Sequence, residues 1–139
     1  MTEFHETSDF VARPVMYIEQ SGGLRLARTQ EPGIYVDLVS GEVLFASSDM
    51  YELGARWLNF SKPIDPAKIR EVQSGSDGMI RTEVRSTRGN NHLGHLFLDG
   101  RPGAGGLRYC IHPALVRFVP RNQMAAEGYG AYLDYLEYV

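Results

Sequence analysis

Two short stretches of this chain carry residues that could do chemistry. HLGHLFLDG places His92 and His95 three positions apart, and RYCIH carries the only cysteine, Cys110, together with His112. A thiolate can act as a nucleophile or as a metal ligand, and an imidazole gains and loses a proton near neutral pH. The chemistry to be explained is therefore centred on Cys110.

The residues alone leave three interpretations open. In the structural one, Cys110 is a small buried hydrophobe and the histidines are hydrogen-bonding strand residues. In the second, His92, His95 and Cys110 hold a metal ion such as zinc with one open coordination position. In the third, Arg108 and the nearby imidazoles lower the pKa of the thiol and make its thiolate available.

The metal and thiol interpretations both require an irregular strand. In a regular strand, residues three apart point to opposite faces, so His92 and His95 would diverge. A bulge or kink at Gly94 would turn both side chains to one face. We therefore expect the strand to be distorted at Gly94.

The surrounding elements are predicted to be mainly antiparallel β-strands. IYVDLV and EVLFAS flank a Ser-Gly pair, which indicates a β-hairpin over residues 34–47. In IRTEVR, apolar and charged residues alternate, as is typical of a half-solvated strand. Further strands are expected at residues 79–86, 92–99, 107–112 and 114–120, and short helices at residues 65–73, after an aspartate cap, and within residues 121–139.

Composition limits the domain organisation and the partners. A chain of 139 residues, 43% hydrophobic and 22% charged, suffices for one domain, which we predict over residues 32–139 behind an N-terminal arm of residues 1–31. The net charge of -3 and the scattered basic residues argue against nucleic-acid binding. No apolar run approaches the ~20 residues of a membrane span, and the first residues lack signal-peptide features. We expect a cytoplasmic monomer.

Several motifs in series resemble the B-type methionine sulfoxide reductases. They are GIYVDLVSGEVLFAS, RTEVRS, HLGHLFLDG, LRYCI and RFVP, followed by EGYGAY, in matching order from about Pro32 to Tyr132. The resemblance implies a mainly β fold of two antiparallel sheets, often called a β-tent, with a few short helices. It also implies reduction of methionine-R-sulfoxide to methionine through a cysteine sulfenic acid, with no cofactor.

The resemblance assigns roles to six residues. Cys110 is the nucleophile, and His92 and His95 flank the sulfoxide oxygen. The remaining roles are those of Asp99, which orients a histidine, Arg108, which supports the thiolate, and Trp57, which packs against the substrate methyl group. We also expect Phe97 and His112 to contribute to substrate binding.

Two departures from the family pattern bear on metal and reductant. Many members bind zinc through two Cys-x-x-Cys pairs, but Asp37 and Ser40 stand where the first pair would fall, so we predict no metal. The usual resolving cysteine is replaced by Ala55. The sulfenic acid must then be reduced by an external thiol, from thioredoxin or a small molecule.

Other departures surround the expected pocket. Arg56, Leu58 and Asn59 replace the usual residues beside Trp57, and His112 stands where the family usually has an asparagine. His112 could donate to the sulfoxide oxygen in place of the amide and leave a working reductase. Alternatively, the chain is a divergent paralogue that acts on another small-molecule sulfoxide, or a non-catalytic module that binds sulfoxide or senses oxidants.

Overall fold

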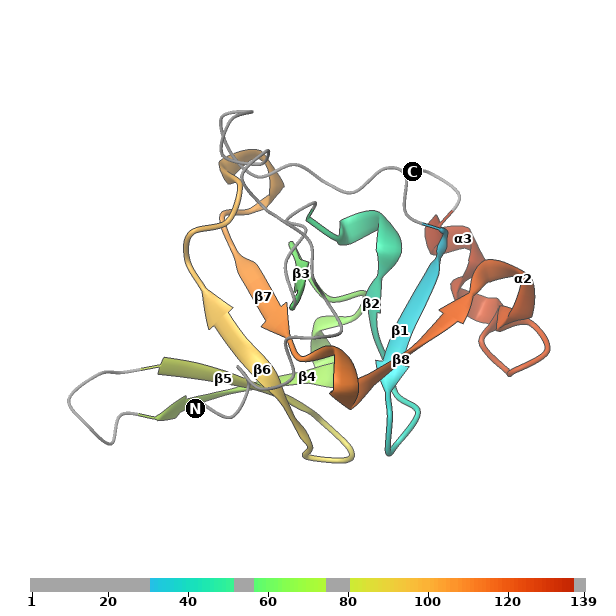
Figure 1. Cartoon of the computed structure of the whole chain (residues 1–139), viewed down its shortest axis with the longest axis horizontal. Helices are drawn as coiled ribbons and strands as arrows, with labels where there is room; N and C mark the ends of the chain where they lie inside the picture. The colour runs from blue at the N-terminus through green and yellow to red at the C-terminus, as the bar shows by residue number, and fades with distance from the viewer. Residues whose placement is uncertain (1–30, 52–56, 75–80, 137–139) are drawn as a thin grey trace.

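The computed structural model describes residues 31–51, 57–74 and 81–136, which fold into two antiparallel β-sheets (Figure 1). The three-stranded sheet has the order β2-β1-β8, and the five-stranded sheet the order β3-β7-β6-β5-β4. This architecture confirms the predicted mainly β class. The strands are β1 (Gly33–Asp37), β2 (Val43–Ala46), β3 (Leu58–Phe60), β4 (Ile69–Ser74), β5 (Arg81–Ser86), β6 (His92–Phe97), β7 (Arg108–Ile111) and β8 (Val116–Pro120).

The predicted hairpin is present as β1 and β2, which pair antiparallel around the turn after Asp37. Gly41 in this turn has a φ of 78°, a conformation that glycine adopts without strain. The strands predicted near β5, β6, β7 and β8 are also confirmed, and β6, β7 and β8 are each shorter than the run that indicated them. The expected short helices near the C-terminus are α2 (Arg121–Met124) and α3 (Leu133–Leu136). In Figure 1 both lie at the end of the molecule beside β1 and β8.

The helix predicted over residues 65–73 is wrong beyond its first turn. Asp65 caps a 3-10 turn at Pro66–Lys68 by accepting a hydrogen bond from the Ala67 N–H at 3.0 Å. From Ile69 onward the chain forms β4, which pairs with β5 over six residues. The local cap signal was correct, but pairing with a neighbouring strand overrides helix propensity in the segment that follows.

Aromatic rings fill the space between the two sheets. Phe45 of β2 stacks on Phe60 of β3 with ring centroids 4.5 Å apart. Tyr109 of β7 packs against Phe45 at 5.7 Å, and Tyr35 of β1 packs against Phe60 at 5.2 Å. Such contacts bury large apolar surfaces and make this the main core. One face of the five-stranded sheet therefore packs against the core.

A polar network joins the β1–β2 turn to the turn between β5 and β6. The Asp37 carboxylate accepts both hydrogen bonds of the Asn91 side-chain amide, at 3.2 and 3.1 Å. Glu42 accepts from the N–H groups of Arg88 and Gly89 at 2.7 and 3.0 Å. Burial opposes ionisation of Asp37, but hydrogen bonds from Ser86, Asn91 and backbone N–H groups outweigh it and lower the pKa of this carboxyl. The network lies where the resemblance would place the first zinc-binding pair.

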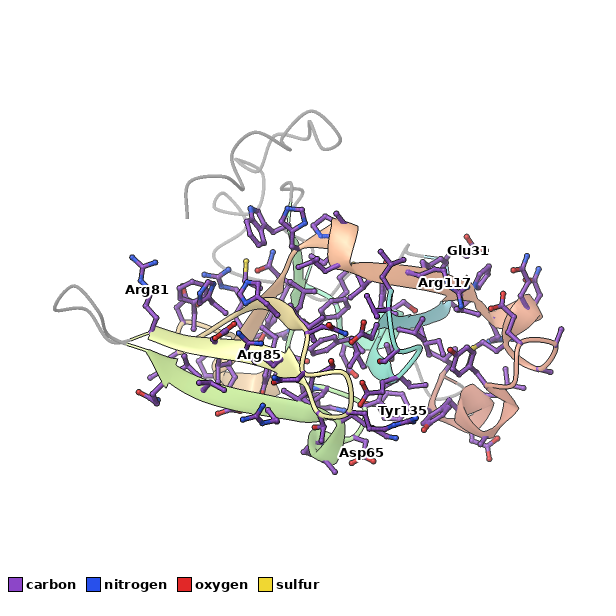
Figure 2. All side chains as sticks on the ribbon, turned by 90° about the horizontal axis from the view of Figure 1, so that it is seen from below. Glu31, Asp65, Arg81, Arg85, Arg117 and Tyr135 are labelled. Carbon is purple, nitrogen blue, oxygen red and sulfur yellow. The ribbon has the colours of Figure 1, made fainter. Side chains whose placement is uncertain are left out.

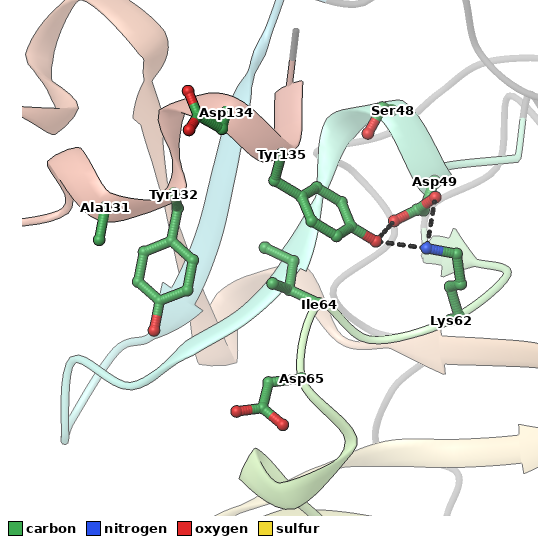
Figure 3. A pocket seen from close by; sticks show the side chains of 9 residues that line it. All are labelled: Ser48, Asp49, Lys62, Ile64, Asp65, Ala131, Tyr132, Asp134 and Tyr135. Carbon is green, nitrogen blue, oxygen red and sulfur yellow. Dashed lines mark hydrogen bonds and ion pairs between the residues drawn. The ribbon is translucent and has the colours of Figure 1, made fainter. Parts of the chain in front are cut away.

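A hollow lies between α3 and the segments that follow β2 and β3. It has a volume of about 750 Å³ and is drawn in Figure 3. On its wall the Tyr135 hydroxyl donates to Asp49 at 2.7 Å, and Lys62 donates to the same hydroxyl. These hydrogen bonds connect α3 to the segments that follow β2 and β3.

In the part of the chain that the structure describes, no helix has the length and apolar character needed to span a membrane.

Candidate active site

The chemistry-bearing residues lie on the face of the five-stranded sheet opposite the core. On β7, Tyr109 and Ile111 are buried in the core, so the alternating residues Arg108 and Cys110 point to the other face. Cys110 is paired across the ladder with His95 of β6 on one side and Asn59 of β3 on the other. Residues directly opposite each other in a sheet share a face, so the thiol lies between these two side chains.

The predicted irregularity of β6 is confirmed. Val84 pairs with Gly94, but the next residue of β5, Arg85, pairs with His92, so Leu93 is an extra residue on β6. The bulge turns both histidines to one face, where the ring centroids of His92 and His95 are 5.5 Å apart.

Gly94 is required for a second reason. A Cβ atom at this position would lie 1.9 Å from the Cys110 carbonyl oxygen of β7. Only glycine permits β6 and β7 to approach this closely. The same residue therefore serves the bulge and brings the histidine strand against the cysteine strand.

Glu83 of β5 is a site residue that sequence reasoning missed. Its Oε2 lies 2.6 Å from Nδ1 of His92 and 3.0 Å from Nη2 of Arg85. Burial disfavours the carboxylate, but the hydrogen bonds from His92 and Arg85 outweigh it and lower the pKa of Glu83. Alternation along IRTEVR does place Glu83 on the charged face, but its partner depends on the register between β5 and β6. Figure 2 labels Arg81 near one end of β5 and Arg85 further along the strand.

His95 differs electrostatically from His92. Burial lowers the pKa of His95, and the positive charges of His92 and Arg81 lower it further. Glu83 acts in the opposite direction but does not compensate for these effects. His95 is thus neutral at neutral pH, while His92 is the imidazole in contact with a carboxylate.

Arg108 is held on three sides. Its Nε and Nη2 donate to the two carboxylate oxygens of Asp99, at 2.8 and 3.1 Å. Its Nη1 donates to Oδ1 of Asn59 at 2.7 Å, and its guanidinium lies 4.6 Å from the centroid of the Phe97 ring. The expectation that Asp99 orients a histidine is therefore corrected, because Asp99 orients Arg108 and the carboxylate on a histidine is Glu83.

The pKa of the thiol moves opposite to the sequence-based expectation. Burial raises the pKa of Cys110 to about 11, although Arg108 acts to lower it. Asp99, which partly neutralises Arg108, adds to the increase. The free-energy cost of removing a thiolate from water is larger than the stabilisation that the partly neutralised Arg108 provides. Cys110 is therefore a protonated thiol in the resting protein.

His112 follows β7 and is buried, with 5% of its surface exposed. Its Nδ1 accepts a hydrogen bond from the Ala114 N–H at 3.1 Å, so the proton of the neutral ring is on Nε2. Burial and the charge of His92 lower the pKa of His112 and favour this neutral form. The Trp57 ring meets it edge to face, with centroids 5.0 Å apart. We call this pair the Trp57–His112 wall.

The structure therefore brings together all of the predicted site residues that sequence and resemblance pointed to, namely Cys110, His92, His95, Asp99, Arg108, Trp57, Phe97 and His112. Leu58 and Asn59 are in β3 beside this group. Ala55 and Arg56 lie outside the described residues. Within the described ranges, no group of three or more histidine, cysteine, aspartate or glutamate residues is arranged to hold a metal ion.

Comparison with known proteins places this chain in a family. A solved structure similar to this chain is the crystal structure of the Mis18 'Yippee-like' domain, which is 12% identical, with a TM-score of 0.49 over 64% of this chain and 96% of that chain. A family model for the SelR domain matches residues 15–120, beginning inside the segment predicted as an N-terminal arm. The chain belongs to the SelR domain family, the family of the B-type methionine sulfoxide reductases.

Proposed function

We propose that this protein reduces methionine-R-sulfoxide to methionine, with Cys110 as the nucleophile and an external thiol as the reductant. The observation that carries the proposal is the gathering of the single thiol, two imidazoles and a guanidinium on one sheet face of a SelR-family chain. The activity of the family is thus supported by residues that could perform it.

The first half-reaction needs no co-reactant. The Cys110 thiolate attacks the sulfoxide sulfur, and the sulfoxide oxygen is transferred to Sγ, giving the thioether and a sulfenic acid. The substrate sulfur gains two electrons and Sγ loses two. The proton lost by the thiol is balanced by the proton delivered to the oxygen, so the step conserves atoms and charge.

The two histidines divide the proton transfers in this proposal. The neutral His95, opposite Cys110 in the ladder, accepts the thiol proton. His92, whose Nδ1 lies 2.6 Å from the Glu83 carboxylate, is assigned as the proton donor to the sulfoxide oxygen. Arg108 stabilises the thiolate that forms between these events.

Regeneration uses a thiol from outside the chain. A first thiol attacks the sulfenic sulfur, forming a mixed disulfide and releasing water, and a second thiol then frees Cys110. Because the chain has one cysteine, thioredoxin or a small thiol must supply both equivalents. This requirement suits a reducing compartment such as the cytoplasm.

Substrate selectivity is assigned to the apolar surfaces beside the thiol. The Trp57 indole offers an apolar face to the S-methyl group, and Phe97 borders the site next to Arg108. The neutral His112 ring carries its proton on Nε2, so a neutral hydrogen-bonding group stands where the family usually has an asparagine amide. The role of His112 as an amide replacement is favoured by this hydrogen-bond pattern.

Mass spectrometry tests the proposal directly. The wild-type protein, exposed to racemic methionine sulfoxide without reductant, should gain one oxygen atom on Cys110 and leave the S epimer unreacted. Cys110→Ser should neither gain oxygen nor turn over with dithiothreitol, because a serine hydroxyl is not ionised near neutral pH. Absence of oxygen transfer from either epimer would favour another sulfoxide or a binding module.

A further inference from the structure

We propose that Asn59 is a positioning residue that holds Arg108 toward Cys110 and connects this guanidinium to the Trp57–His112 wall. The catalytic meaning of this inference rests on the proposed function. Its test follows the thiol itself and requires no sulfoxide.

The position of Asn59 in the sheet is unusual for an amide. It is the middle residue of the edge strand β3, directly opposite Cys110, and only 3% of its surface is exposed. Its neighbour Phe60 points into the core and stacks on Phe45, which fixes the strand and aims Asn59 at the other face. A buried amide without hydrogen-bond partners destabilises the folded protein by about 1–3 kcal/mol. The two hydrogen bonds of Asn59 are therefore needed to keep it at this position.

The first hydrogen bond gives Arg108 a buried anchor. Oδ1 of Asn59 accepts from Nη1 at 2.7 Å. The other anchor is Asp99, whose side chain is 64% exposed. A carboxylate attracts the guanidinium but also neutralises it, and Asp99 raises the pKa of Cys110. The neutral oxygen of Asn59 fixes the same group and leaves its positive charge for the thiolate.

The second hydrogen bond leads to the substrate-binding side. Arg108 can only donate, so the oxygen of Asn59 must face it and the nitrogen must face away. That nitrogen, Nδ2, donates to the backbone carbonyl of Trp57 at 3.2 Å. The indole of Trp57 in turn contacts the ring of His112. One amide therefore joins the group that stabilises the thiolate to the wall of the pocket.

The chain supplies its own reporters for a test. Cys110 is the only cysteine, so the rate of alkylation by iodoacetamide reports on this thiol alone. Trp57 is the only tryptophan, so the tryptophan fluorescence reports on the Trp57–His112 wall. In Asn59→Leu, which keeps the approximate volume and removes both hydrogen bonds, we expect the alkylation rate at pH 8 to fall about tenfold, equivalent to one pKa unit. The emission maximum should also shift.

A double-mutant cycle separates positioning from general structural support. If Asn59 acts through Arg108, Asn59→Leu should cause no further loss of alkylation rate in an Arg108→Gln background. Equal fractional losses in both backgrounds, or no loss in either, would overturn the inference. Asn59→Ser, whose shorter side chain cannot span the two partners, provides a gentler second variant with the same expected direction.

Asn91→Leu is the matched control. This amide is also partly buried and makes two hydrogen bonds, but to Asp37 in the turn network. It should lower the melting temperature and leave the pH dependence of alkylation unchanged. Because alkylation needs no substrate, a protein inactive on methionine sulfoxide could still show the Asn59–Arg108 coupling, and an active one could lack it.

Discussion

At the scale of single residues, the contact between Glu83 and His92 distinguishes the two active-site histidines. Both imidazoles lie on the same face, 5.5 Å apart, and like charges at this distance oppose each other. Glu83 contacts His92, whereas burial and the charges of His92 and Arg81 lower the pKa of His95. The proposed division into a proton donor and a proton acceptor thus depends on a residue from a neighbouring strand.

Glu83→Gln is therefore expected to impair the proton donor. The amide keeps the shape and can still accept a hydrogen bond, but it no longer stabilises the charged imidazole of His92. We expect kcat/KM with methionine-R-sulfoxide to fall about tenfold at pH 7.5, a loss of roughly 1.4 kcal/mol in transition-state stabilisation. Glu127→Gln, which alters an exposed ion pair with Arg117, should leave kcat/KM unchanged.

His112 offers a second prediction at the residue scale. Its Nδ1 accepts from the Ala114 N–H, as the oxygen of an asparagine at the start of a helical turn would. In His112→Asn we expect stability within about 0.5 kcal/mol of wild type, and activity on the R epimer that is retained or improved. His112→Ala should lose about 1 kcal/mol because the cap is removed. Thermal melts and kcat/KM for both epimers measure these effects.

A different result for His112→Asn would identify a reshaped site. If wild type and His112→Asn are both inactive on the R and S epimers while a variant that also reverts Arg56, Leu58 and Asn59 is active, the pocket has diverged toward another sulfoxide. Neighbouring pocket residues act together, so single reversions would then be insufficient.

At the scale of elements, the bulged strand β6 and its approach to β7 create the site. Regular pairing would send His92 to the core face, away from Cys110. The extra residue Leu93 changes this, and the missing side chain of Gly94 lets the two strands close. The arrangement of the candidate catalytic groups is consequently a property of the strand pair.

Gly94→Ala tests this dependence. Its added methyl group would meet the Cys110 carbonyl oxygen at 1.9 Å, so β6 and β7 must separate. We expect a loss of about 3 kcal/mol or more in the free energy of unfolding, together with loss of activity in any protein that folds. Urea unfolding measures the first effect. Gly103→Ala, where a Cβ meets nothing within 4 Å, is the control and should be close to neutral. Equal stability of the two variants would contradict the close approach.

At the scale of the whole molecule, the Asp37 network joins the two sheets at their turns. It links the β1–β2 hairpin of one sheet to the β5–β6 connection of the other through Asn91 and Ser86. Hydrogen bonds to the buried Asp37 carboxylate therefore hold the two turns together.

The contribution of Asp37 to stability should depend on pH. Its folded pKa is lowered, so the stabilisation is complete above the ordinary aspartate pKa of about 3.9 and is lost as pH falls through the lower folded value. Asp37→Asn should therefore be less stable than wild type at pH 7, by about 2 kcal/mol, and the difference should shrink below pH about 4. Chemical unfolding across pH measures it. An exposed control, Asp134→Asn, should show a pH-independent difference near zero.

Much of this protein could be predicted from its sequence because the relevant signals are local. Alternation, β-rich composition and the turn around Gly41 indicate antiparallel strands wherever the chain is packed. The spacing of His92 and His95 around Gly94 already requires a bulge if both are to reach Cys110. The motif order identifies the family, since each motif is a contiguous run of residues.

The tertiary structure alone decided which groups meet across strands. Residues 69–73 became a strand because β5 offered a partner, and β3 is too short to leave a pattern. Glu83 contacts His92, and Asp99 contacts Arg108, because register sets these partners. The direction of the Cys110 pKa shift depends on how deeply the thiol is buried. The residues adjacent to Cys110 in the sequence do not determine this burial. Local patterns therefore determine the elements and the reactive types, whereas register and burial determine their partners and protonation.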